Sequence, residues 1–174
     1  MNTPNKLTMI RIALIPVFLL ILYFDVPYGN YAAMAVFIIA SLTDFADGYI
    51  ARKRRQVTDF GKFMDPLADK ILVFSAMLWY VDQDLMPAWA VLIVIIREFM
   101  VTALRLIAVD KGRVIAAEIS GKIKTAVTMV CLTVMFLPLE LWMLYVCIGA
   151  ITITTVVSGI EYFIRNKDCL SWEK

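Results

Sequence analysis

The 174-residue sequence contains no histidine and has little charge, with Asp, Glu, Lys and Arg making up 18% of its residues. Without imidazole, the chain cannot carry histidine-based phosphotransfer, a Ser-His-Asp triad or an imidazole metal site. Metal binding or acid–base chemistry must therefore rely on carboxylates. The three cysteines, Cys131, Cys147 and Cys169, are far apart, which predicts packing residues rather than a disulfide framework or a thiolate metal site.

Polar residues are scarce as well, because 61% of the residues are hydrophobic and the mean hydropathy is +0.79. A soluble domain is about 45–50% apolar and about 25% charged, so this composition excludes an ordinary soluble protein. One membrane span needs ~20 mostly apolar residues. We therefore expect an all-α integral membrane protein with six transmembrane helices, forming one domain over residues 1–174. The apolar stretches are Leu7–Phe24, Tyr31–Ala51, Leu67–Val81, Ala88–Ile107, Ile119–Leu137 and Leu139–Ile164.

Basic residues are segregated to alternate ends of these stretches. The connections at residues 25–30, 82–87 and 138 contain no Lys or Arg. The opposite ends carry Lys6, Arg11, Arg52 to Arg55, Lys62, Lys70, the basic residues from Arg105 to Lys124, Arg165, Lys167 and Lys174. Because Lys and Arg are retained on the cytoplasmic side, we expect a multi-pass protein of the cell membrane with both termini in the cytoplasm.

Carboxylates occur within the second and third apolar stretches or at their basic ends. Asp44, Asp47, Gly48, Ala51 and Arg52 fall on one face of a helix, which combines two acids, two very small residues and one guanidinium. Ionisable groups within a membrane span are costly and usually functional. This stripe is typical of a ligand-binding face.

A second pair of acids, Asp65 and Asp69, lies four residues apart where the third stretch begins. Both pairs should therefore meet at one depth near the cytoplasmic interface. Four carboxylates close together in low dielectric repel one another unless divalent cations are bound. Oxygen ligands favour Mg²⁺, Mn²⁺ or Ca²⁺ over zinc or copper. A solvated collar of acids paired with nearby basic residues is the alternative, but two of the acids lie too deep for casual solvation.

The full pattern, Asp44-x2-Asp47-Gly48-x2-Ala51-Arg52-x8-Gly61-x3-Asp65-x3-Asp69, resembles the signature of the CDP-alcohol phosphotransferase family. The resemblance implies that Asp44, Asp47 and Asp65 bind two divalent ions, Mg²⁺ or Mn²⁺. It implies that Asp69 is the general base and a further metal ligand. It also implies a homodimer. The residues it assigns to CDP-diacylglycerol are Gly48, Ala51, Arg52 and Gly61, with a looser match at Asn5, Thr8, Thr58 and Arg11.

Segments outside this signature resemble the bacterial phosphatidylglycerophosphate synthases of the same family. They are Arg97-Glu98-Phe99, Thr102-Ala103-Leu104-Arg105 and Gly121-Lys122-Ile123-Lys124-Thr125-Ala126. This resemblance implies transfer of the phosphatidyl group from CDP-diacylglycerol to glycerol 3-phosphate, with release of CMP. The activity would face the cytoplasm and serve the synthesis of anionic phospholipid.

The basic residues near the predicted site suggest an anionic acceptor. Lys62, Arg105, Lys122 and Lys124 could form a clamp for its phosphate group. For each of these cations, and for Arg11, the alternative is that the side chain extends to the membrane interface. Arg97 and Glu98 lie deeper, and we expect an internal ion pair that holds the fourth helix.

Other functions remain open from the sequence. Inositol phosphate, serine or phosphatidylglycerol could replace glycerol 3-phosphate as the acceptor. A small cation transporter also uses intramembrane acids, although it would place them near the bilayer midplane. A purely structural membrane protein does not account for the glycine and alanine spacing. Nothing in the sequence indicates a nucleic-acid partner.

Overall fold

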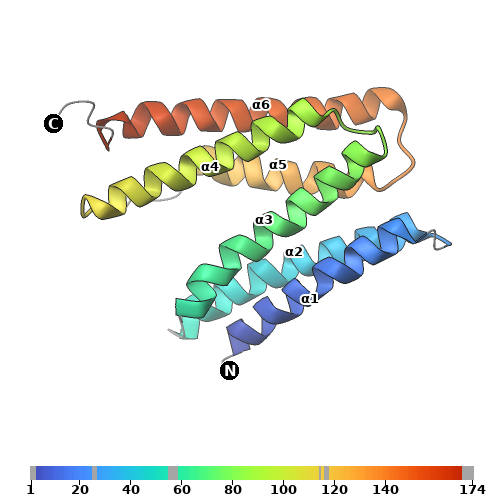
Figure 1. Ribbon diagram of the computed structural model, residues 1–174, viewed down its shortest axis with the longest axis horizontal. Coiled ribbons are helices and arrows are strands. Elements are labelled where there is room, and N and C mark those ends of the chain that lie inside the picture. The colour runs from blue at the N-terminus through green and yellow to red at the C-terminus, as the bar shows by residue number, and fades with distance from the viewer. Residues whose placement is uncertain (1–2, 25–26, 55–58, 114, 116–117, 170–174) are drawn as a thin grey trace. The chain divides into compact units, whose positions relative to one another are not determined.

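The computed structural model describes residues 3–24, 27–54, 59–113, 115 and 118–169. These described residues form six α-helices, a short 3-10 helix and no strand (Figure 1). Each apolar stretch of the sequence corresponds to one helix, which confirms the all-helical prediction. The helices are α1 (Thr3–Tyr23), α2 (Gly29–Arg54), α3 (Asp59–Asp82), α4 (Ala88–Asp110), α5 (Ile119–Met135) and α6 (Leu141–Asn166), followed by η1 (Lys167–Cys169).

The largest difference from the expected boundaries is at the start of α3. The apolar stretch begins at Leu67, whereas the helix begins at Asp59. Its first two turns contain Asp59, Lys62 and Asp65, so hydropathy alone does not detect them. At the end of α4, Gly112 adopts a left-handed conformation with φ of 70°. Its N–H donates to Val109 and that of Arg113 to Ala108, so this turn satisfies two carbonyls that the helix leaves free.

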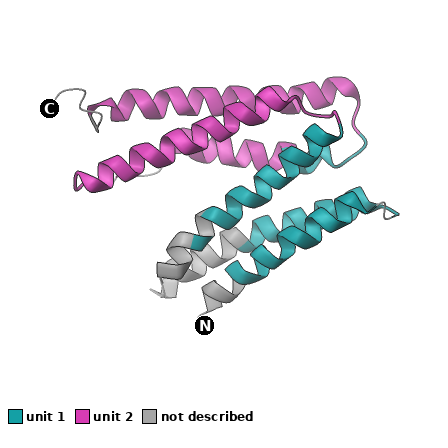
Figure 2. Cartoon of the chain, viewed as in Figure 1, with its two compact units in different colours: residues 1–83, 132–138 teal, residues 84–131, 139–174 magenta. Residues whose placement is uncertain are grey.

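The chain divides into two compact units (Figure 2). Unit 1 contains residues 1–83 and 132–138, and unit 2 contains residues 84–131 and 139–174. The second and third helices, which carry the predicted acids, are in unit 1. The predicted cations of the fourth and fifth helices are in unit 2. The expectation of one domain over residues 1–174 stays a prediction.

Unit 1 is organised around α1, which packs against both α2 and α3. Phe18 and Phe37 are fully buried, and their ring centroids lie 6.0 Å apart. Phe136 lies 5.9 Å from each of them, and Tyr80 lies 5.3 Å from Phe136. The hydroxyl of Tyr80 donates a 3.0 Å hydrogen bond to the carbonyl oxygen of Leu132 in the last turn of α5. That bond satisfies a carbonyl that has no partner within its helix.

Unit 2 is organised around the packing of α4 against α6. On α4 the buried residues Val94, Val101, Leu104 and Ala108 recur at helical spacing. On α6 the buried residues are Leu144, Ile148, Ile151, Thr155, Ser158 and Tyr162. Three of these last residues are polar, so the α4–α6 contact changes from apolar to polar toward the C-terminal end of α6. Cys131 and Cys147 are half-buried free thiols.

The membrane character of the helices is clearest in α6. Among the described residues, it is the helix whose length and apolar composition alone suffice to cross a bilayer. Residues 8–23 and 29–43 form shorter apolar segments, while α4 is interrupted by Arg97, Glu98 and Arg105. Along α6, Trp142, Tyr145 and Ile153 are more than 60% exposed. Apolar side chains left outside the protein core in this way suit contact with lipid.

Candidate active site

The predicted acids lie on two consecutive helices of unit 1. Helix α2 carries residues 44, 47, 48, 51 and 52, and α3 carries residues 61, 62, 65 and 69. Asp44 lies ten residues before the end of α2, and Asp69 lies ten residues after the start of α3, about 15 Å in each case. Asp47 and Asp65 lie about 10 Å from the same ends. Asp44 and Asp69 therefore lie at about the same distance from the connection between α2 and α3. The same holds for Asp47 and Asp65, which lie closer to it.

The side chains of most of these residues lie outside the part of the chain that the structure describes. This holds for Asn5, Asp44, Asp47, Gly48, Ala51, Arg52, Gly61, Lys62 and Asp65, and Thr58 is undescribed as a whole. Asp69 is described and is half-buried. No group of three or more potential metal ligands occurs among the described side chains. The metal and nucleotide assignments therefore stay predictions.

Two polar residues of α1 are buried in unit 1. Thr8 is 1% exposed and Arg11 is 0% exposed. They lie three residues apart and so share one face of the helix. The burial of Arg11 excludes the alternative in which its guanidinium extends to the interface.

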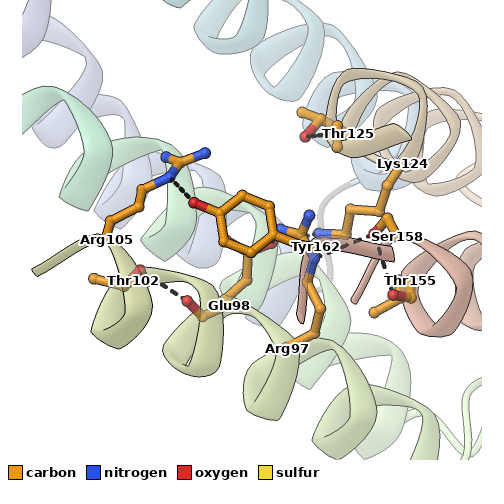
Figure 3. Close-up of polar contacts among 10 residues, drawn as sticks. Arg97, Glu98, Thr102, Arg105, Lys124, Thr125, Thr155, Ser158 and Tyr162 are labelled. Carbon is orange, nitrogen blue, oxygen red and sulfur yellow. Dashed lines mark hydrogen bonds and ion pairs between the residues drawn. The ribbon is translucent and has the colours of Figure 1, made fainter. Parts of the chain in front are cut away.

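Unit 2 contains a buried ionic group formed by Arg97, Glu98 and Lys124 (Figure 3). Oε1 of Glu98 lies 3.0 Å from Nη1 of Arg97 and 2.8 Å from Nζ of Lys124. The three side chains are 11%, 17% and 6% exposed in that order. The predicted ion pair between Arg97 and Glu98 is confirmed, and the burial of Lys124 excludes its extension to the interface. Lys124 joins the group from α5, a contact that the sequence analysis did not foresee.

The guanidinium of Arg97 is also held from α6. Its Nε donates a 3.2 Å hydrogen bond to Oγ of Ser158, and the Ser158 hydroxyl donates to the carbonyl of Thr155. Two glycines leave space for the side chain. A Cβ at Gly121 would lie 3.2 Å from Nη2 of Arg97, and one at Gly159 would lie 3.2 Å from its Cγ. These residues fix Arg97 in one position between three helices.

Arg105 lies two turns beyond Glu98 on α4 and contacts Tyr162 of α6 (Figure 3). Its Nε donates a 3.2 Å hydrogen bond to the Tyr162 hydroxyl, and its Cζ lies 5.7 Å from the ring centroid. Lys122 is exposed. Since it is two residues from Lys124, it lies about 200° away around α5. Arg105 is exposed as well, whereas Lys124 is buried. Together with Arg97, Glu98, Ser158 and Tyr162, they make up the polar region of unit 2, and Lys122 lies on another side of its helix.

The polar region of unit 2 has an excess of positive charge. Among the described residues joined by the contacts above, Arg97, Lys124 and Arg105 carry three positive charges, and Glu98 carries one negative charge. A phosphate monoester carries about 1.5 to 2 negative charges at pH 7. The surplus of two positive charges therefore matches one phosphate group. Arg97 and Tyr162, which the sequence analysis did not assign to the acceptor, belong to the same region.

Known proteins resemble this chain over most of its length. A family model of CDP-alcohol phosphatidyltransferases matches residues 1–159. The chain is 46% identical to the Bacillus subtilis CDP-diacylglycerol–glycerol-3-phosphate 3-phosphatidyltransferase, over 97% of both chains. It is 37% identical to a probable phosphatidylglycerophosphate synthase of Mycobacterium tuberculosis, over 94% of this chain and 81% of the relative.

The Escherichia coli K12 CDP-diacylglycerol–glycerol-3-phosphate 3-phosphatidyltransferase is 36% identical, over 90% of this chain and 88% of the relative. These relatives extend the likeness well beyond the acid signature. They cover α4, α5 and most of α6, the helices that form the polar region of unit 2. The match to the family model and the extent of these similarities show that the chain belongs to the CDP-alcohol phosphatidyltransferase family.

Proposed function

We propose that this chain transfers the phosphatidyl group of CDP-diacylglycerol to glycerol 3-phosphate, giving phosphatidylglycerol phosphate and CMP. The observation that carries the proposal is the similarity of nearly the whole chain to the family and to relatives named for this reaction. The positions of the signature acids along α2 and α3 are consistent with it. The reaction class follows from the family, and the choice of substrates follows from the names of the relatives. The reaction would supply anionic phospholipid to a bacterial membrane.

The donor set fits a pair of hard divalent cations. Asp44, Asp47, Asp65 and Asp69 supply only carboxylate oxygens, which suit Mg²⁺ or Mn²⁺. When bound, such ions neutralise the pyrophosphate and the charge that collects on the departing CMP. The first three acids would hold the ions, and Asp69 would face the acceptor as well.

The remaining chemistry is assigned to residues of the chain. Asp69 takes the proton from the attacking hydroxyl of glycerol 3-phosphate. That hydroxyl oxygen forms a bond to the phosphorus of the phosphatidyl group, while the bond from this phosphorus to the CMP oxygen breaks. Gly48, Ala51 and Gly61 would leave room for the nucleotide, and Arg52 would contribute positive charge. Asn5, Thr8 and Thr58 would line its other side.

The acceptor is bound through its phosphate by Arg105 and Lys124, with Lys62 and Lys122 adding charge. The surplus of two positive charges over Arg97, Glu98, Arg105 and Lys124 supports a phosphate-bearing acceptor over serine. Inositol phosphate carries the same group, so charge alone does not separate it from glycerol 3-phosphate. The names of the relatives favour glycerol 3-phosphate.

The proposal places the protein in the membrane with six spans and both termini in the cytoplasm. The apolar length of α6 and the segregation of loop Lys and Arg support this topology. The acids near the basic ends of the second and third spans would then face the cytoplasm, where glycerol 3-phosphate is available. A homodimer is part of the proposal through the family resemblance.

Kinetics of charge-removing variants test the acceptor assignment. A charge-assisted hydrogen bond in a partly desolvated site contributes about 2–3 kcal/mol, or about 30- to 150-fold in an equilibrium constant. Arg105→Ala and Lys124→Ala should raise the KM for glycerol 3-phosphate by this order and leave the KM for CDP-diacylglycerol nearly unchanged. Lys122→Ala should raise the KM for glycerol 3-phosphate less, because Lys122 is exposed on another side of α5. Arg52→Ala should do the reverse.

A matched control for these variants is Arg165→Ala. Arg165 is 63% exposed and pairs with Glu161 at the end of α6, so its loss should change neither KM. If the four site variants affected both substrates equally, the cations would have a structural or lipid-anchoring role. The acceptor assignment would then be wrong.

A further inference from the structure

Tyr162 contacts Arg105, a predicted acceptor-binding cation, yet its own side chain is buried between α4 and α6. It is 2% exposed and packs with Val101 and Leu104 of α4, with Ile115 against them. Its main-chain oxygen accepts a 2.8 Å hydrogen bond from Nδ2 of Asn166. Its ring is therefore enclosed in the α4–α6 contact, and its hydroxyl lies beside Arg105.

The contact with Tyr162 determines which part of the Arg105 guanidinium is available. A guanidinium presents its N–H donors in a planar fork, and Arg binds phosphate best through two parallel hydrogen bonds. Nε of Arg105 is used by the Tyr162 hydroxyl at 3.2 Å. Within the described residues, Nη1 and Nη2 of Arg105 have no acceptor or ion-pair partner. The edge formed by these two nitrogens is free for a bidentate contact.

Holding the guanidinium in this way has a thermodynamic consequence. An exposed arginine side chain has several rotatable bonds and loses much conformational freedom when it binds a ligand. The bond to Nε and the ring contact at 5.7 Å restrict that freedom before the ligand arrives. Preorganisation of this kind strengthens binding without adding a contact to the ligand.

We propose that Tyr162 is a positioning residue for acceptor binding, which orients Arg105 so that its Nη1–Nη2 edge meets the phosphate of the acceptor. This inference rests on the proposed function. Tyr162 does not touch the substrate. Its effect on acceptor binding passes entirely through Arg105.

Tyr162→Phe tests the inference, because it keeps the buried ring and removes only the hydroxyl. We expect the KM for glycerol 3-phosphate to rise roughly 3- to 10-fold, the range for one hydrogen bond. The kcat and the KM for CDP-diacylglycerol should be unchanged. Tyr145→Phe is the matched control, since Tyr145 is on the same helix and is 68% exposed, and it should change none of these values.

The same substitution in an Arg105→Ala background separates positioning from a structural role. If Tyr162 acts through Arg105, Tyr162→Phe should have no further effect on the KM for glycerol 3-phosphate in that background. An equal fold-change in both backgrounds would overturn the inference, as would an equal change in the KM of both substrates.

The experiment also separates this inference from the proposed function. If Arg105→Ala raises the KM for glycerol 3-phosphate while Tyr162→Phe leaves it unchanged, the positioning role is wrong and the acceptor site stands. If Arg105→Ala itself leaves that KM unchanged, the acceptor assignment is wrong and the inference falls with it.

Discussion

Replacement of Glu98 by Gln should destabilise the protein strongly, because its carboxylate separates two buried cations. Nη1 of Arg97 and Nζ of Lys124 contact the same oxygen at 3.0 and 2.8 Å, so they lie no more than about 6 Å apart. Two unit charges at that distance repel by about 3 kcal/mol at an effective dielectric constant of about 20. Breaking a buried ion pair typically costs about 3–5 kcal/mol. We expect Glu98→Gln to lower the free energy of unfolding by this amount.

Reversible unfolding in mixed detergent micelles, followed by tryptophan fluorescence, measures this loss. Glu140→Gln is the matched control, because Glu140 is exposed and its side chain makes no capping hydrogen bond at the start of α6. The double variant Glu98→Gln/Lys124→Met removes one of the two cations and should be more stable than Glu98→Gln alone. The reasoning is refuted if Glu98→Gln and Glu140→Gln have the same stability, or if the double variant is no more stable than the single one.

Three further predictions follow from the packing, the acids and the charge pattern. Gly159→Ala should be less stable than Gly149→Ala in the same unfolding assay, because both gain helix propensity but only a Cβ at Gly159 would crowd Cγ of Arg97, at 3.2 Å, while one at Gly149 meets nothing within 4 Å. Asp65→Asn should abolish CMP release and weaken divalent-ion binding, whereas Asp69→Asn should lose turnover and retain more affinity for CDP-diacylglycerol; near-normal turnover of Asp69→Asn would exclude it as the base. In intact cells an impermeant thiol reagent should label single cysteines placed at Asn30, Asp84 and Pro138 but not at Gln56 and Asn166, and labelling at position 56 would contradict the proposed topology.

The helices were predictable from the sequence because each contains a long apolar stretch between polar connections. The start of α3 was not, since its first two turns are charged and resemble a loop in a hydropathy profile. The ion pair of Arg97 with Glu98 was predictable because two adjacent opposite charges in a span stabilise each other. Lys122 and Lys124 were predicted to form one clamp, although residues two apart lie about 200° apart around a helix. The structure gives them very different exposure.

Contacts between helices required the structure. Lys124 reaches Glu98 from α5, and Tyr162 reaches Arg105 from α6. These pairs are 26 and 57 residues apart in the chain. They depend on how each helix is rotated about its axis against α4, which helical periodicity alone does not determine. Gly159 shows the same limit, because its close approach to Arg97 has no local sequence signal.

The most direct test of the proposed function is CMP release by the purified full-length protein in detergent. CDP-diacylglycerol is supplied with glycerol 3-phosphate, inositol phosphate, serine or phosphatidylglycerol in separate reactions, each with and without EDTA. We expect CMP release and formation of phosphatidylglycerol phosphate with glycerol 3-phosphate alone, abolished by EDTA and restored by excess Mg²⁺ or Mn²⁺. Release that is insensitive to EDTA, faster release with another acceptor, or no release with any acceptor would contradict the account.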